Sequence, residues 1–228
     1  MNKKIMKKIV TVLLVFISSL SFAQINKDLG EFDTVSVFDR ISVQLIPSNE
    51  NKIEISGSRA NDVELVNKNG ILKIRMALRK LLDGEDVSAK LYYKQIQEIN
   101  ASEGTYVICD ESINQTSIKV NAIEGSEVRL KLDVKKATLR AVTGGILKIK
   151  GSATNSEVSI GTGGVLQGME LETVQTTVKI TTGGEAEVYA TELVDAKVRA
   201  GGNVMIFGKP KQINQKITLG GSVNESKR

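Results

Sequence analysis

Apolar and polar residues alternate one by one along most of the chain after residue 100. The stretches Ile118–Ala122 and Val128–Leu132 both place single polar residues between apolar ones. Period-two alternation is typical of a strand with one buried and one exposed face. The spacing of three and four that a helix needs does not fit these segments. This part of the sequence therefore predicts strands.

Gly-containing turns separate the alternating stretches at a nearly constant interval. Their first residues lie at 101, 122, 141, 160, 180, 200 and 219, which gives steps of 21, 19, 19, 20, 20 and 19 residues. A unit of about 20 residues cannot bury its own apolar face, whereas stacked copies can. The seven segments are Ala101–Val107, Ala122–Val128, Ala141–Leu147, Ile160–Leu166 and Ile180–Ala186, followed by the shortened Ala200–Val204 and Leu219–Val223.

Stacking of such units predicts an all-β fold, a parallel β-helix-like solenoid of about seven coils. The uneven steps favour the right-handed form, because a left-handed hexapeptide helix would keep a strict multiple of six. A series of antiparallel hairpins is the alternative, since Gly-Gly turns between alternating stretches also describe hairpins.

Glycine pairs recur at the same place in the unit. A turn that folds alike in every coil needs a positive φ, which glycine adopts without Cβ strain. A phosphate-binding loop would also need a following helix, which the pattern lacks. We therefore predict a structural turn column made of Gly144, Gly145, Gly163, Gly164, Gly183, Gly184, Gly201, Gly202, Gly220 and Gly221.

The N-terminal half lacks the repeat but alternates in the same way. It is predicted to cap the first coil, because an uncovered coil exposes an unpaired strand edge. At the other end, the polar run Asn224–Arg228 could blunt the last edge. Strands are predicted at 34–37, 41–46, 52–57, 63–66, 71–76 and 87–93, with a hairpin turn at 67–70 and a loop or helical turn at 78–85.

The chain begins like a secretory protein. Four lysines within the first eight residues precede an apolar run at 9–17, and Ser21-Phe22-Ala23 offers a small-x-small cleavage site before Gln24. The run is shorter than the roughly 20 residues that span a membrane. Residues 1–23 are thus predicted to be a signal peptide, with export to the periplasm or the cell surface. Residues 24–228 are then a single β domain, divided into an N-terminal region at 31–99 and a repeat region at 100–223.

Composition narrows the chemistry. The chain has no His and no Trp, and removal of the signal leaves 27 basic against 26 acidic residues. Without His there are no His-dependent nucleophile pairs and none of the usual zinc sites, and near-neutral charge argues against nucleic acid. Cys109, in an apolar stretch, is predicted to be a buried small hydrophobe. We predict no catalytic residue, no cofactor and no metal site.

The order of these features resembles a known family. Phe32-Asp33-x-Val35-x-Val37, then Ile41-x-Val43, the Gly-containing repeats and the closing runs Gly208–Lys211 and Ile217–Val223 are similar to the putative auto-transporter adhesin, head GIN domain family. The resemblance covers nearly all of residues 31–223. It implies a β-helix-like envelope protein of Bacteroidetes-type bacteria, with no catalytic residues to carry over. The chain departs from the family's common Ser-Gly-Ser-Gly-Asp turns, using Thr-Gly-Gly without the Asp.

The leading functional prediction is a non-enzymatic exported adhesin or interaction scaffold that binds an envelope or host glycan or protein, with self-association into a homo-oligomer left open. Basic residues that alternate with core positions could form an outward strip facing an anionic glycan, or could simply be solubilising charges. These residues are Arg129, Lys131, Lys148, Lys150, Lys179 and Arg199.

Two other functions stay open at this stage. A polysaccharide lyase or hydrolase would need convergent carboxylates, for which the sequence offers the clusters Asp83, Glu85, Asp86 and Asp110, Glu111. Binding of ice or a crystal surface would use a hydroxyl ladder of Thr143, Thr162 and Thr182.

Overall fold

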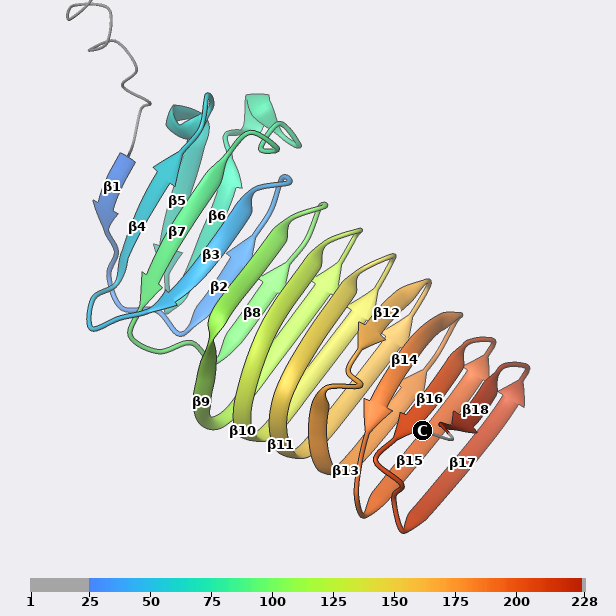
Figure 1. Ribbon diagram of the computed structural model, residues 1–228. Coiled ribbons are helices and arrows are strands. Elements are labelled where there is room, and N and C mark those ends of the chain that lie inside the picture. Colours follow the sequence, from blue (N-terminus) through green and yellow to red (C-terminus); the bar gives the residue numbers. More distant parts are fainter. Residues whose placement is uncertain (1–24, 227–228) are drawn as a thin grey trace, which may run out of the picture.

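Three long strands define the architecture of the protein, whose computed structural model describes residues 25–226 (Figure 1). Strands β9 (Tyr106–Ile123), β10 (Glu127–Val142) and β11 (Ile146–Gly161) each curve through most of a coil and pair in parallel with the next. Alternate residues point inward, as the sequence pattern predicted. The all-β solenoid is therefore confirmed, and the antiparallel hairpin alternative is wrong for the repeat region.

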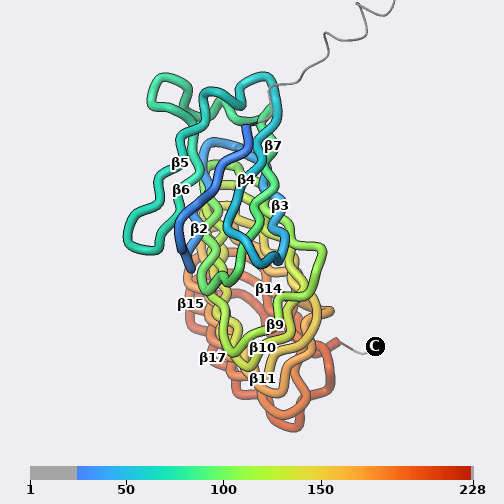
Figure 2. The backbone as a smooth tube through the Cα atoms, turned by 90° about the vertical axis from the view of Figure 1, so that its left-hand side faces the viewer, coloured from blue at the N-terminus to red at the C-terminus, as the bar shows by residue number. Residues whose placement is uncertain are grey.

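Each coil has two flat faces joined by two edges. The Gly-containing turns lie at one edge, which we call the turn edge. At the other edge, the bend edge, strands such as β10 bend near residues 135–136. We call the face toward the viewer in Figure 1 the front face and the opposite one the back face. Figure 2 looks along the solenoid from its N-terminal end, with the back face on the left and the front face on the right. The chain rises on the back face, crosses the turn edge and descends on the front face while it moves away from the viewer. That path is right-handed, as the uneven steps suggested.

The later coils split these long strands into shorter ones. The front face continues through β12 (Gly164–Gln167), β14 (Gly184–Tyr189), β16 (Asn203–Phe207) and β18 (Ser222–Glu225), and the back face mainly through β13 (Leu171–Ile180), β15 (Leu193–Ala200) and β17 (Gln212–Leu219). All of these pairings are parallel.

Stacked apolar side chains fill the space between the two faces. One such ladder passes through Val128, Leu147, Leu166, Ala186 and Val204, which are at most 1% exposed. Because each coil offers an apolar residue at the same inward position, burial is repeated from coil to coil, which is the stabilising principle of a solenoid.

Departures from a constant coil length have local causes. Cys109 pairs with Leu130 but Ser112 with Lys131, so Asp110 and Glu111 form a two-residue bulge that accounts for the step of 21. A loop at Gly168–Glu170 adds one residue to the step between β11 and β13.

One predicted step is wrong. Ile180 pairs with Val198, not with Ala200, so this coil has 18 residues instead of 20. The turn keeps its length, because two residues precede the glycine pair both after Ile180 and after Val198. The two residues are lost between β14 and β15, since Gln167 pairs with Glu187 at a distance of 20 residues but Gln175 pairs with Leu193 at 18. Alignment from the residue before the turn therefore misplaced the copy by two residues.

The N-terminal region continues the solenoid but does not follow chain order. On the back face the order is β6 (Ile71–Met76), β2 (Thr34–Val37), β8 (Glu98–Ala101), and on the front face β7 (Ser88–Tyr93), β3 (Ser42–Pro47), β9. The coil made by residues 34–47 is thus inserted between two coils that come later in the sequence.

Antiparallel strands close this end, as the predicted cap requires. On the front face β4 (Lys52–Ser56) pairs antiparallel with β7, and β1 (Ile25–Asp28), which the sequence pattern did not predict, pairs with β4. On the back face β5 (Val63–Lys68) and β6 form the predicted hairpin. Two short 3-10 helices, Ala60–Asp62 and Leu78–Lys80, complete the cap.

The C-terminal end is open in the part of the chain that the structure describes. Strands β17 and β18 pair only with the preceding coil, and Leu219 is 72% exposed. Gln215 and Glu225 occupy positions aligned with the buried Ala196 and Ile206. Polar residues at inward positions of a terminal strand disfavour further strand addition.

Other sequence predictions concern the termini. The predicted signal peptide lies outside the described residues, as do Lys227 and Arg228 of the polar C-terminal run. Among residues 25–226 the structure contains no helix with the length and apolar character needed to cross a membrane.

Candidate binding surface

The two irregular coils shape a groove on the front face. The Asp110–Glu111 bulge lies on one side and the Gly168–Glu170 loop on the other, and residues from both line a groove of about 460 Å³. We call this hollow the front groove. Its other polar lining residues are Arg129, Lys148, Lys150, Gln167 and Glu187, and Ile108 and Met169 contribute apolar surface.

A second hollow adjoins the front groove on the side of the cap. It has a volume of about 410 Å³ and shares Ile108 with the front groove. Ser42, Gln44, Lys90 and Tyr106 are among its lining residues. The Gln44 amide donates a hydrogen bond of 3.1 Å to Asp110, so the bulge joins the two hollows.

Glu127 organises the cations beside the groove. Its carboxylate accepts hydrogen bonds from Arg129 and lies 3.0 Å from the Lys148 ammonium. Partial burial alone would raise the pKa of Glu127, but the hydrogen bonds from Lys148 and Arg129 outweigh it, so the pKa is lowered from its ordinary value. The Arg129 guanidinium also lies 5.2 Å from the centre of the Tyr106 ring.

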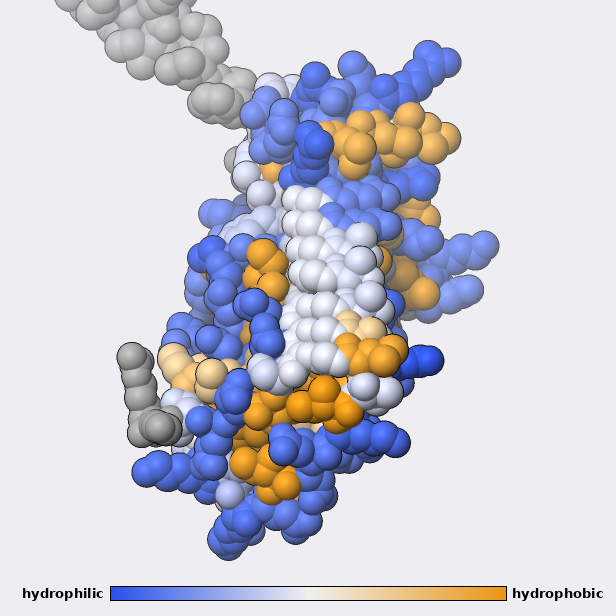
Figure 3. Space-filling model, turned by 90° about the vertical axis from the view of Figure 1, so that its right-hand side faces the viewer, coloured by the Kyte–Doolittle hydropathy of each residue, from blue (hydrophilic) through white to orange (hydrophobic). Residues whose placement is uncertain are grey.

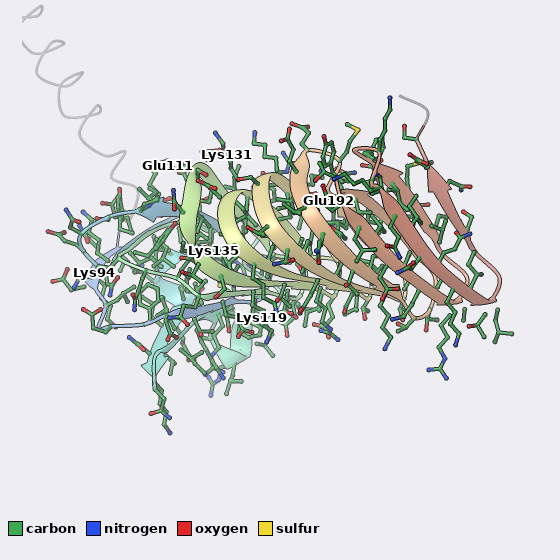
Figure 4. The ribbon with its side chains drawn as sticks, turned by 90° about the horizontal axis from the view of Figure 1, so that it is seen from below. Lys94, Glu111, Lys119, Lys131, Lys135 and Glu192 are labelled. Atoms are coloured by element: carbon green, nitrogen blue, oxygen red, sulfur yellow. The ribbon has the colours of Figure 1, made fainter. Side chains whose placement is uncertain are left out.

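The predicted basic strip is divided between the two faces. Arg129 pairs with Lys148 and Lys131 with Lys150, so these four form a block on the front face. Figure 4 shows Lys131 near Glu111 on the front side of the bend edge and Lys119 on its back side. The remaining two, Lys179 and Arg199, lie on the back face in β13 and β15. The six residues therefore do not make one strip.

On the back face the cations follow the regular ladder. Lys179, Lys197 and Lys216 occupy one row on β13, β15 and β17. No hollow of comparable size interrupts these strands among the best-formed cavities of the described residues. A cationic row on a flat sheet is typical of a solvated surface.

The two acidic clusters considered for catalysis differ in their surroundings. In the cap, Asp83 pairs with Arg59 and Glu85 with Arg40, 3.3 Å away. Asp110 instead lines the front groove together with Glu170 and Glu187, two carboxylates that the sequence did not single out. Within residues 25–226 no three His, Cys, Asp or Glu side chains lie close enough to hold a metal ion.

The glycines of the turn column have two different roles. In two turns the positive φ falls on Thr143-Gly144 (52° and 75°) and on Thr162-Gly163 (44° and 72°). Gly145 is not in this conformation, so the reason predicted for it is wrong. A Cβ there would lie 2.0 Å from the carbonyl oxygen of Ala122, and glycine is needed because the coils approach so closely.

Gly164 repeats the role of Gly145, since a Cβ there would lie 2.1 Å from the carbonyl oxygen of Ala141. In the last three turns both glycines have positive φ, for example 53° and 130° at Gly183 and Gly184. Figure 3 shows the turn edge as a pale column between hydrophilic flanks. The threonines predicted as a hydroxyl ladder belong to this edge, where the Thr162 amide donates to the Thr182 carbonyl oxygen at 2.5 Å.

Cys109 is buried, as predicted. It is 3% exposed, its sulfur lies 3.9 Å from the Tyr93 hydroxyl, and it forms no disulfide. Burial raises the pKa of the Cys109 thiol, which disfavours the thiolate. The residue thus acts as part of the core beneath the front groove.

Sequence reasoning missed much of the groove. Ile108, Gln167 and Glu187 stand at outward strand positions and Met169 in the Gly168–Glu170 loop, and their importance depends on the bulge and the loop nearby. The available signal was the pair of long steps in the repeat, because additional residues in a solenoid must leave the regular path.

Comparison with solved structures shows the same fold in proteins of Bacteroides and Parabacteroides species. A protein described as a putative adhesin from Bacteroides fragilis has a TM-score of 0.84 at 15% identity, over 91% of this chain and 98% of that chain. A putative lipid binding protein from Parabacteroides distasonis has a TM-score of 0.70 at 15% identity, over 92% and 98%. A putative adhesin from Parabacteroides merdae has a TM-score of 0.68 at 20% identity, also over 92% and 98%.

A comparison with curated protein sequences gave no significant match. The profile of one family, described as putative auto-transporter adhesin, head GIN domain, matches residues 31–210. This range includes the cap and most of the repeat region, in agreement with the resemblance found in the sequence. The chain therefore belongs to the head GIN domain family.

Proposed function

We propose that the mature chain is an exported, non-enzymatic adhesin that binds an anionic glycan in the front groove. The observation that carries this proposal is the groove itself, which the two irregular coils create on an otherwise regular solenoid. The family's adhesin description and the adhesin names of two relatives support the general role.

The chemistry of the groove suits a sugar acid. Arg129, Lys148 and Lys150 offer charged donors for carboxylate or sulfate groups, and Gln167 offers an amide for hydroxyl groups. The neighbouring Tyr106 ring provides an apolar surface next to these donors. Glu127 holds Arg129 and Lys148 in place, so the donors are ordered before a ligand arrives.

A matched pair of charge reversals tests this proposal. The front variant carries Arg129→Glu, Lys131→Glu, Lys148→Glu and Lys150→Glu, and the back variant carries Lys179→Glu, Lys197→Glu, Arg199→Glu and Lys216→Glu. Both change the net charge equally. On arrays of anionic and neutral glycans and on intact cells, we expect at least a tenfold loss of binding for the front variant alone, equivalent to about 1.4 kcal/mol. Equal losses for both variants would indicate non-specific attraction and contradict the proposal.

A glycan-cleaving enzyme is the second candidate, because Asp110, Glu170 and Glu187 line the same groove. Paired carboxylates are the usual acid and base of glycoside hydrolysis. The purified protein would be incubated with envelope polysaccharides, and new reducing ends or unsaturated sugars would be measured. Turnover that disappears in Glu187→Gln or Asp110→Asn would replace the adhesin proposal with this one.

A further inference from the structure

The loop that joins β6 to β7, residues 77–87, exposes an unusual amount of apolar surface. We call it the cap loop. Leu78 is 72% exposed, Leu81 52% and Leu82 45%, so three of the ten exposed large apolar side chains of the described chain fall within five residues. Figure 3 shows an apolar patch in orange at this end of the molecule, bordered by hydrophilic residues. A patch of this kind usually marks an interaction site.

The base of the cap loop is firmly held. The Asp39 carboxylate, 1% exposed, accepts hydrogen bonds from the amides of Met76 and Leu82, both at 2.9 Å. The Gly84 amide donates to the Asp39 carbonyl oxygen at 3.0 Å. The leucines are therefore presented by an anchored loop and are not exposed through loss of structure.

The conformation of Leu82 points in the same direction. Its φ is 63°, in the left-handed region that bulky side chains rarely adopt. Such strain persists only where surrounding contacts impose it, and it concentrates at functional sites. Here the hydrogen bond to Asp39 imposes it, and the Leu82 side chain is directed to the surface instead of the core.

The tip of the cap loop is also cationic. Arg79 and Lys80 lie between Leu78 and Leu81, are exposed, and form no ion pair with any described residue. Two acids at the base are paired with arginines, Asp83 with Arg59 and Glu85 with Arg40. A third, Asp86, accepts a hydrogen bond from Ser58. Three leucines on either side of two unpaired cations make an amphipathic tip.

We propose that the cap loop docks the protein on the surface of an anionic phospholipid bilayer. Leu78, Leu81 and Leu82 enter the boundary between headgroups and acyl chains, and Arg79 and Lys80 contact lipid phosphates. The tip of the loop projects from the cap (Figures 1 and 2), and a bilayer surface can receive a projecting tip. Behind the tip, Leu81 and Leu82 also line a hollow that contains Glu103 and Glu124, so Leu78, Arg79 and Lys80 make the first contact with the lipid. The proposal rests on this loop alone and is independent of the front groove.

A single tryptophan reports insertion directly, because the chain contains none. The variant Leu81→Trp would be mixed with vesicles of phosphatidylcholine and phosphatidylglycerol at 3:1. We expect a blue shift of its emission and quenching by brominated acyl chains. Leu219→Trp, placed at a residue as exposed as Leu78 but at the opposite end of the solenoid, is the matched control and should show neither effect.

Sedimentation of the mature chain with the same vesicles measures the contribution of each group. The triple variant Leu78→Ser, Leu81→Ser, Leu82→Asn should lower the partition coefficient at least tenfold, whereas Leu219→Ser should not change it. Asparagine is chosen at position 82 because it tolerates positive φ. Arg79→Gln with Lys80→Gln should weaken binding and reduce its dependence on salt, and circular dichroism would verify the fold of each variant.

Three outcomes would overturn the proposal. The wild-type chain could remain in the supernatant, or the triple variant could sediment like the wild type. A photo-crosslinker at position 81 could also capture one envelope protein while vesicles bind nothing, which would assign the leucines to a protein partner.

Discussion

The cap and the repeat region hold their stacked coils in place by different kinds of hydrogen bond. Both stack coils with buried apolar interiors, but in the repeat region backbone hydrogen bonds link the turns of successive coils, such as Gly125 N–H to the Thr143 carbonyl oxygen at 3.0 Å. The cap depends on individual polar side chains. Asn51 donates to the Gly30 carbonyl oxygen and accepts from the Lys94 amide, and Asp39 holds the cap loop.

This difference shows what repetition contributes. A coil that matches its neighbours needs no special side chain to fix its register, because each inward residue meets an equivalent one. A coil without such neighbours must be positioned by unique contacts. We therefore expect the repeat region to be sensitive to backbone crowding and the cap to the loss of single polar groups.

The largest expected effect is on the turn edge of the repeat region. Gly164→Val would place a side chain against the Ala141 carbonyl oxygen, and we expect a loss of about 3 kcal/mol in the free energy of unfolding by urea. Gly163→Asn is the matched control, because its φ of 72° suits asparagine and a Cβ there meets nothing within 4 Å. It should cost under about 1 kcal/mol. Equal losses would show that crowding between coils is not decisive.

The cap should respond to the loss of one carboxylate. Asp39→Asn keeps a residue that tolerates the φ of 61° but leaves one of the two amide donors without an acceptor. We expect a loss of about 2 kcal/mol and faster proteolysis within residues 77–87. Asp133→Asn, at an exposed position of the repeat region, should change stability by under about 0.5 kcal/mol. Unchanged proteolysis in the Asp39 variant would contradict the anchoring role.

A deletion can make the irregular coil more like its neighbours. Removal of Asp110 and Glu111 keeps the alternation of β9 and restores the spacing of 19 residues. We expect the melting temperature to change by only a few degrees, because the bulge contributes little burial, whereas glycan affinity should fall at least tenfold, by about 1.4 kcal/mol. If the shortened chain binds the glycan as well as the wild type does, the ligand does not bind in the front groove.

The smallest expected effect depends on pH. The pKa of Glu127 is lowered in the folded protein, so the ionised side chain stabilises the fold above its ordinary pKa of 4.5. Glu127→Gln should cost about 0.5 kcal/mol at pH 7. The difference in stability between the wild type and this variant should disappear as the pH falls below 4.5 and Glu127 becomes protonated at its lowered pKa. Urea unfolding at pH 7 and pH 3 would measure it, and a difference that grows on acidification would reverse the assigned sign.

The sequence by itself determined the repeat region. Alternation identified the strands of β9 to β18, and the interval between turns predicted parallel coils and their right-handed path. These features could be predicted because they depend on interactions between residues one coil apart, and such interactions recur with the period of the sequence. The burial of Cys109 followed from the same local pattern.

Only the tertiary structure decided what does not repeat. The insertion of the coil at 34–47 between later coils depends on contacts between distant segments, which alternation cannot encode. The front groove exists because the Asp110 bulge and the Met169 loop meet on one face, and Gly145 is required because another backbone lies against it. Each of these features depends on which surfaces meet in space, and the alternation of residues along a single strand does not determine those contacts.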